Sequence, residues 1–174
     1  MLARCVVVWS VIEERFRGYP GREKVVKFLL EHGLQVNERG HVGVDGVEIP
    51  HLQIGERVGV DRRVVDATCA AIRKDPLLAG IFENIRTIHL LRDVAPSLGL
   101  RVIVVKPDDA RQTGLLGEVA MKVAEFGISI RQAVSDDPYL VAEPLLTIIV
   151  EGSISGGLVE ELVRIPGVKG VTIY

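Results

Sequence analysis

One segment constrains the fold of this chain more than any other, because residues 101–130 combine a strand, a loop, a helix and the start of a further strand. Residues 101–106 are apolar and rich in β-branched side chains, as in a strand, and residues 107–114 interrupt that run. From Leu115 to Phe126, apolar residues recur at the spacing of a helix that buries one face, and Gly127 can end it.

The loop before this helix is a candidate binding site. Gly114 allows the backbone to approach a small molecule closely, and the unpaired amides of a first helical turn favour an anionic group such as a carboxylate. In this interpretation the amides of Gly114 and Leu115 hold a carboxylate, and Asp108 or Asp109 pairs with an amine. Taken alone, the same residues fit an ordinary loop better, since Asp and Gly are common turn residues.

A resemblance to a known family favours the binding-site interpretation over the ordinary loop. Asp109, residues 113–116 and residues 124–130 resemble the first strand, loop and helix of an ACT domain, a small-molecule sensing module of amino-acid metabolism. The resemblance implies a ferredoxin-like βαββαβ fold and an amino-acid ligand. The rest of the chain fits that order, with strands at 130–135, 145–150 and 168–173 and a helix at 158–163. The implied ligand-binding residues are Asp108, Asp109, Thr113, Gly114, Leu115, Leu116 and Ser129.

Ser129 marks a departure from the family. ACT amino-acid sites often have an asparagine at the start of the second strand, and Ser129 stands at the matching position. A serine supplies one hydroxyl in place of an amide that both donates and accepts.

The N-terminal half is expected to be mainly helical. Helices are predicted at 6–16 and 22–32, followed by a β-hairpin in which residues 42–44 and 47–49 flank Asp45-Gly46, a dipeptide that tolerates positive φ angles. A further short helix is predicted at 77–85, after Asp75-Pro76, and residues 86–100 read as a connector with some structure of its own.

Residues 51–74 show a helix-turn-helix pattern. A helix at 51–58 leads through Gly59 to Asp61, a good N-cap for a second helix at 62–74. Residues 54–65 resemble the DNA-binding units of many bacterial-type regulators. The candidate DNA-binding residues are Arg62, Arg63, Asp66 and Arg73. A solvated helix start, or a three-helix unit that contacts only protein, is an equally good interpretation of these residues.

Composition limits the functional classes. A net charge of −2 argues against a strongly basic nucleic-acid coat, and residues 1–95 carry 14 basic and 13 acidic side chains. The longest apolar runs are too short to span a bilayer and no secretory signal order opens the chain, so we expect a soluble cytoplasmic protein. Cys5 and Cys69 lack CxxC spacing and are expected to be buried thiols, with no disulfide or zinc site.

No catalytic motif is present. The four histidines, His32, His41, His51 and His89, show no HxH or HExxH spacing, and neither a GxSxG nor a Walker pattern occurs. We therefore expect a protein that is not an enzyme and needs no cofactor or metal.

The whole chain is similar to two-domain ACT proteins described as regulators of amino acid metabolism. A helix-turn-helix-like domain with connector is predicted at 1–95 and an ACT domain at 96–174, an α+β organisation. The resemblance implies an allosteric, ligand-responsive regulator that binds DNA and is a homodimer or higher homo-oligomer. The alternative is an ACT regulatory subunit or adaptor that docks on a metabolic enzyme.

Overall fold

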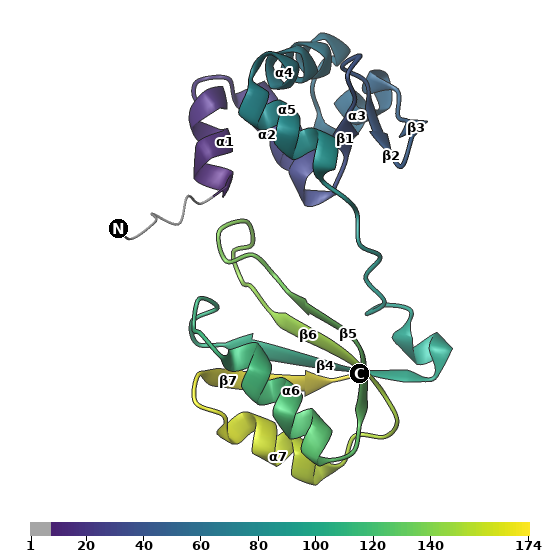
Figure 1. Cartoon of the computed structure of the whole chain (residues 1–174), viewed down its shortest axis with the longest axis vertical. Helices are drawn as coiled ribbons and strands as arrows, with labels where there is room; N and C mark the ends of the chain where they lie inside the picture. Colours follow the sequence, from purple (N-terminus) through teal and green to yellow (C-terminus); the bar gives the residue numbers. More distant parts are fainter. Residues whose placement is uncertain (1–7) are drawn as a thin grey trace. The chain divides into compact units, whose positions relative to one another are not determined.

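A computed structural model of the chain describes residues 8–174. By its contacts the chain divides into two compact units, one ending at Ile88 and one beginning at His89. Cys5 and the first two residues of the helix expected at 6–16 lie outside the described residues. The two units are described separately below (Figure 1).

The first unit holds the expected helices. They are α1 (Val8–Phe16), α2 (Pro20–Glu31), α3 (His51–Val58), α4 (Arg62–Lys74) and α5 (Pro76–Asn84). Their apolar faces pack with Val36 and Val42 of a small sheet to form one core, whose largest fully buried side chains are Phe16, Phe82, Ile12, Leu29, Ile72 and Leu78. The helix-turn-helix pair is thereby packed on α2 and α5 and is not an isolated motif.

A small antiparallel sheet separates α2 from α3. Its strands are β1 (Gln35–Val36), β2 (Val42–Val44) and β3 (Val47–Glu48), in that order. The predicted hairpin is confirmed: Val44 pairs with Val47, and the two turn residues Asp45 and Gly46 have φ angles of 47° and 85°. Strand β1 was not predicted, because two residues are too few to show an alternating pattern.

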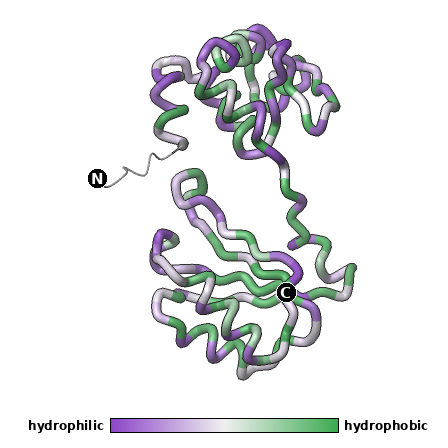
Figure 2. Tube along the Cα trace, in the orientation of Figure 1, coloured by the Kyte–Doolittle hydropathy of each residue, from purple (hydrophilic) through white to green (hydrophobic). Residues whose placement is uncertain are grey.

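The second unit has the ferredoxin-like order βαββαβ, as expected. It comprises β4 (Leu100–Pro107), α6 (Leu115–Glu125), β5 (Ser129–Ser135), β6 (Leu146–Glu151), α7 (Gly156–Arg164) and β7 (Val168–Ile173). The sheet order is β5-β6-β4-β7, and every adjacent pair is antiparallel. The two central strands, β4 and β6, are largely hydrophobic and buried (Figure 2).

The two faces of this sheet are covered differently. Helices α6 and α7 lie on one face, where Ile103, Ile148, Val119 and Leu162 are among the buried side chains. The connector covers the other face, where Ala95 of the 3-10 helix Ala95–Leu98 packs with side chains of β4 and β6. Each face therefore carries its own hydrophobic cluster.

Gln132 of β5 fastens the connector. Its Nε2 donates to the carbonyl oxygen of His89 at 2.8 Å, and its Oε1 accepts from the backbone amide of Leu91 at 3.0 Å. Residues 89–95 therefore make contacts with the sheet, and the division by contacts falls before them, whereas the boundary expected from sequence lies near residue 95.

Candidate functional site

The turn between α3 and α4 has the geometry of a helix-turn-helix. Gly59 adopts a left-handed conformation, with φ 75° and ψ 43°, and ends α3. The amide of Val60 donates to the carbonyl of Gly55 at 2.9 Å, and a Cβ added at Gly55 would lie 2.7 Å from the carbonyl oxygen of Val60. Glycine at position 55 therefore allows the chain to fold back closely on α3.

Asp61 starts α4 as predicted. Its side chain accepts a hydrogen bond from the amide of Arg63 at 2.8 Å. Along α4, Val65, Thr68, Cys69 and Ile72 are buried. The opposite side of the helix carries the candidate residues Arg62, Arg63 and Asp66, which are exposed.

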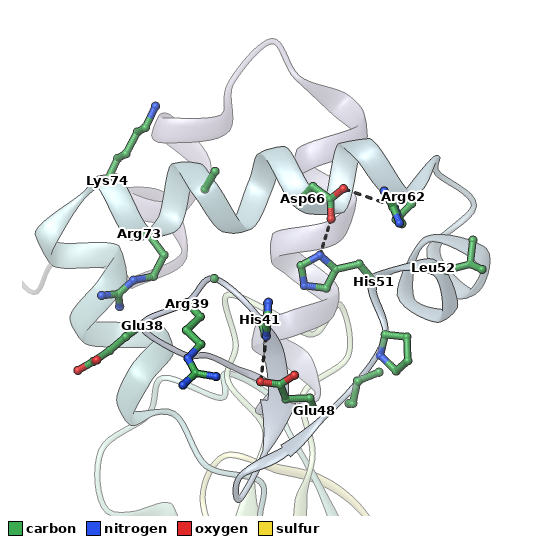
Figure 3. A pocket seen from close by; sticks show the side chains of 14 residues that line it. Glu38, Arg39, His41, Glu48, His51, Leu52, Arg62, Asp66, Arg73 and Lys74 are labelled. Atoms are coloured by element: carbon green, nitrogen blue, oxygen red, sulfur yellow. Dashed lines mark hydrogen bonds and ion pairs between the residues drawn. The ribbon is translucent and has the colours of Figure 1, made fainter.

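A groove of about 780 Å³ runs beside α4 in this unit (Figure 3). Helix α4 forms one wall, and the β1–β2 turn, β3 and the start of α3 form the other. Its charged lining consists of four basic and three acidic side chains, which are Arg39, Arg62, Arg73, Lys74, Glu38, Glu48 and Asp66. The groove contains three of the four candidate DNA-binding residues, and Arg63 lies outside it.

A line of polar contacts crosses this groove. The amide of Val42 lies 3.3 Å from Nε2 of His51, and Nδ1 of the same ring lies 2.6 Å from Oδ1 of Asp66. Because the amide can only donate, Nε2 accepts and Nδ1 carries the proton that is shared with Asp66. The second oxygen of Asp66 lies 3.5 Å from Nε of Arg62, one helical turn earlier (Figure 3).

A second histidine–carboxylate pair lies nearby. Nδ1 of His41 is 2.9 Å from Oε1 of Glu48, and that bond lowers the pKa of the Glu48 carboxyl below its ordinary value. The rings of His41 and His51 meet edge to face, with centroids 6.3 Å apart. Neither histidine was a predicted site residue, because no local spacing links either of them to its carboxylate.

Cys69, a buried residue of α4, lies beside the ring of His51. Its Sγ is 3.9 Å from Nε2 of His51, and burial raises the pKa of the thiol to about 12. The thiol is therefore protonated and unreactive at neutral pH, as expected for a buried cysteine. Among residues 8–174 no group of three or more His, Cys, Asp or Glu side chains is arranged to hold a metal ion.

Arg73 has a different environment from Arg62. It forms an ion pair with Glu83 of α5, and only 26% of its side chain is exposed, compared with 64% for Arg62. Arg73 therefore fastens α5 to α4, whereas Arg62 at the N-terminal end of α4 is the more exposed of the two.

The second candidate site is the loop between β4 and α6. Gly114 is left-handed, with φ 89°, and precedes α6 without any side-chain cap. It lines a pocket of about 380 Å³ together with Leu115 and Leu116, and the far wall comes from Ser135 and Leu146. Three of the predicted ligand residues thus share one pocket in a single copy of the chain.

The other predicted ligand residues do not line that pocket. The carboxylate of Asp109 accepts hydrogen bonds from the backbone amide and the guanidinium of Arg111, at 2.9 Å, 3.0 Å and 3.2 Å. These bonds lower the pKa of Asp109. Asp109 therefore stabilises the turn, and any contact with an amine would have to replace an internal partner.

Ser129 lies at the other end of the sheet. It pairs with Glu151, whereas the pocket residue Ser135 pairs with Leu146. Six residues of extended strand correspond to about 20 Å. Ser129 and Gly114 of one copy of the chain therefore cannot contact the same small molecule.

The turn before β7 supports the same loop. The amide of Asp108 donates to the carbonyl of Gly167 at 2.8 Å, and Nε2 of Gln112 donates to the carbonyl of Pro166 at 2.9 Å. Gly167 has φ 89°, and a Cβ there would overlap the Gln112 side chain. Asp108 and Gln112 are thus held against the turn before β7, and Gly114, which follows them, lines the pocket.

Comparisons with known proteins give only distant matches. No family model matches the chain, and a search of curated proteins finds no match. The solution structure of the C-terminal domain of the MgtC protein from Mycobacterium tuberculosis aligns with 43% of this chain and 83% of its own, at 22% identity and a TM-score of 0.32. An AsnC family transcriptional regulator from Agrobacterium tumefaciens aligns over 88% of this chain and 86% of its own, at 13% identity and a TM-score of 0.29.

These likenesses are too distant to carry a functional argument. What the structure itself defines is a class of architecture: an α+β chain with a helix-turn-helix unit followed by a ferredoxin-like unit. None of the helices within residues 8–174 has the length and apolar character needed to cross a membrane.

Proposed function

We propose that this chain is a ligand-responsive regulator of amino acid metabolism that binds DNA through the α3–α4 unit. The observation that carries the proposal is the tight turn at Gly59, followed by a helix whose first turn exposes Arg62 and Arg63. In helix-turn-helix proteins the N-terminal residues of the second helix contact base edges in the major groove. The proposal assigns no catalytic role to the chain.

Salt-dependent DNA binding tests this proposal. Fluorescence anisotropy with genomic duplex fragments would be measured at several salt concentrations for the wild type and for Arg62→Ala/Arg63→Ala. Each neutralised phosphate adds about 0.9 to the slope of log affinity against log salt, so losing these two cationic side chains should reduce the slope by roughly one to two. The control is Arg92→Ala/Arg164→Ala, which removes the same charge from the second unit. A DNA affinity that changes neither with salt concentration nor with the α4 substitutions contradicts the proposal.

The second part of the proposal is that the β4–α6 loop senses an amino acid. The pocket beside Gly114 has a volume suited to a small ligand, and the amides at the start of α6 lie where a carboxylate is favoured. Support for the ligand's class comes from the ACT resemblance of the sequence, and Ser129 would have to contribute from a second copy of the chain.

Thermal shift against the twenty amino acids tests the sensor. A ligand present at 100 times its Kd stabilises the folded state by about 2.7 kcal/mol. Leu116→Glu places a negative charge beside the pocket and should abolish the shift, whereas Met121→Glu, on the same helix but outside that pocket, should not. No shift with any of the twenty amino acids would contradict the sensor.

We include a homodimer in the proposal because strands β5 and β7 form the two edges of the second sheet. An unpaired edge can add a further strand, and side-by-side pairing of two copies would satisfy its backbone groups. Such pairing would also bring Ser129 of one copy toward its neighbour. Sedimentation analysis should give twice the mass of the chain, and a monomer at all concentrations would refute this part.

A second candidate function is a regulatory subunit that docks on a metabolic enzyme. It is favoured by the apolar side chains of Met121 and Val163, which are 63% and 50% exposed on α6 and α7. Helices with such exposed residues can contact another protein. Co-purification separates the two functions, since the regulator should retain DNA and the subunit should retain one enzyme.

A further inference from the structure

Asp66 is the acidic residue among the candidate DNA-binding residues on the exposed side of α4. A carboxylate there would repel DNA phosphates if it were unpaired. Both of its oxygens have partners in this structure, since Oδ1 lies 2.6 Å from Nδ1 of His51 and Oδ2 lies 3.5 Å from Nε of Arg62. The negative charge of Asp66 is therefore paired with His51 and Arg62 and is not free to repel a phosphate.

The position of Asp66 is fixed from the interior of the unit. His51 is only 14% exposed, and its other ring nitrogen accepts from the amide of Val42 in the small sheet. The ring therefore cannot rotate without losing a bond to the backbone. This distinguishes the Arg62–Asp66 contact from an ordinary surface ion pair, which involves two mobile side chains and contributes little.

Arg62 presents the rest of its guanidinium outward. The closest contact of Asp66 to Arg62 is at Nε, and no hydrogen bond involves the two terminal nitrogens of Arg62 among residues 8–174. Those nitrogens form the fork that binds O6 and N7 of guanine in the major groove. A carboxylate bound at Nε limits rotation of the fork, which reduces the entropy lost when it binds a base.

We propose that Arg62 reads a guanine in the DNA major groove and that Asp66 and His51 are positioning residues that orient its guanidinium. The inference rests on the proposed DNA binding and assigns base readout to one residue of the site. Arg63 differs from Arg62, because its guanidinium has no partner in the described part of the chain. It is assigned to a phosphate, where a freely moving charge is sufficient.

Selection from a random-sequence duplex library tests this assignment. Full-length wild type, Asp66→Asn, Arg62→Lys and Arg63→Ala would each be used to select 20-base-pair duplexes, followed by affinity measurements on the best sequence and on a copy with its guanine replaced. Asp66→Asn keeps the shape of the side chain but replaces one accepting oxygen with a donor, so it cannot serve both partners. Arg62→Lys keeps the charge and removes the fork.

We expect the wild type to prefer guanine at one position in each half-site by roughly 5- to 150-fold. Arg62→Lys should lose this preference while keeping the salt slope, and Asp66→Asn should lower the preference several-fold. Arg63→Ala should weaken binding to all sequences alike and reduce the slope by about one. The control, Glu31→Gln, breaks the Lys27–Glu31 pair at the same i, i+4 spacing on α2 and should change none of these values.

His51→Ala tests whether the contact between His51 and Asp66 helps to orient Arg62. If His51 acts through Asp66, the double variant His51→Ala/Asp66→Asn should lose no more guanine preference than whichever of its two single variants loses more. Circular dichroism of each variant confirms that the unit is folded, and Asp66→Asn, at an exposed position, decides the positioning role if His51→Ala unfolds the unit.

The outcomes separate this inference from the proposed function. A wild type that does not bind the library at all overturns both. Salt-dependent binding with no preferred sequence, or with a guanine preference that Arg62→Lys leaves intact, overturns only the role of Arg62. A preference that survives in Asp66→Asn overturns the positioning role.

Discussion

The two units place their candidate sites on different kinds of structure. In the first unit the site residues belong to helices and to a small sheet, and side-chain contacts such as His51–Asp66 hold them in place. In the second unit the candidate site is a loop whose backbone amides and left-handed Gly114 face a pocket. The first arrangement suits a ligand of fixed shape such as duplex DNA, and the second suits a small molecule that a loop can surround.

The hydrophobic cores of the two units also differ. The first unit has one core shared by all five helices and strands β1 and β2, whereas the second has separate clusters on the two faces of its sheet. Because no cluster contains residues of both units, a defect in one core should leave the other intact. The following predictions test this comparison, beginning with the largest effect.

Core truncation should affect one unit at a time. Phe82 of α5 and Ile148 of β6 are both fully buried, in different cores. Phe82→Ala should cost about 3–5 kcal/mol in the first unit and Ile148→Ala about 2–5 kcal/mol in the second. Urea unfolding followed by hydrogen exchange would show which amides lose protection. Leu52→Ala, at a position that is 54% exposed, serves as the control. Equal loss of protection in both units would show that they are one cooperative body.

Two glycines should respond differently to alanine. A Cβ at Gly55 would lie 2.7 Å from the Val60 carbonyl oxygen, so the turn must shift, at a cost of roughly 1–3 kcal/mol. A Cβ at Gly114 would meet only Oε1 of Glu118, at an ordinary contact distance of 4.0 Å, so the φ of 89° is the main obstacle and Gly114→Ala should cost about 1 kcal/mol. Thermal unfolding of the two variants measures the difference, and a larger loss at Gly114 would reverse the comparison.

The helix N-caps offer a smaller contrast. Asp75 accepts hydrogen bonds from the amides of Leu77 and Leu78, at 2.9 Å and 3.2 Å, and also pairs with Arg15. Ser155 caps α7 through one bond of 3.3 Å to the amide of Leu158. Asp75→Ala should lower the free energy of unfolding by about 1–2 kcal/mol and Ser155→Ala by about 0.5 kcal/mol. Equal losses in chemical denaturation would show that the extra contacts of Asp75 add nothing.

The smallest predicted effect is a dependence on pH. The hydrogen bond from Arg15 is the main cause of a lowered pKa at Asp75. A carboxyl whose pKa is lower in the folded state stabilises the fold above its unfolded pKa, and that contribution is lost as pH falls through the folded value. Asp75→Asn should therefore weaken the fall in stability of the first unit in acid. An unchanged acid profile from pH 6 to pH 3 would contradict this assignment.

Local sequence patterns predicted most of the fold. The spacing of apolar residues from Leu115 to Phe126 matches the observed helix Leu115–Glu125, and Asp45-Gly46 forms the hairpin turn that its φ preferences indicate. Asp61 caps α4 as expected. These features are fixed by residues close together in the chain, where backbone preference and periodicity act directly. The two-residue strand β1 and the packing of residues 89–95 on the sheet depend on distant partners and were not predicted.

In the candidate sites, too, local sequence signals predicted some residues, whereas others depend on partners far away in the chain. Sequence alone selected Arg62 and Gly114, since a helix start and a glycine before a helix are local signals. It did not select His51, which lies 15 residues before Asp66 and meets it only because the small sheet and α3 bring the ring to α4. Nor could it show that Arg73 is paired with Glu83, or that Ser129 lies at the far end of β5 from the loop.

The sequence by itself determined most of the elements, their order and the cap at Asp61, because these depend on neighbours within a turn or two. Only the tertiary structure decided which charges are already paired and which remain available to a ligand. A hydrogen bond between side chains depends on distance in space, and separation along the chain does not specify that distance until the cores have packed.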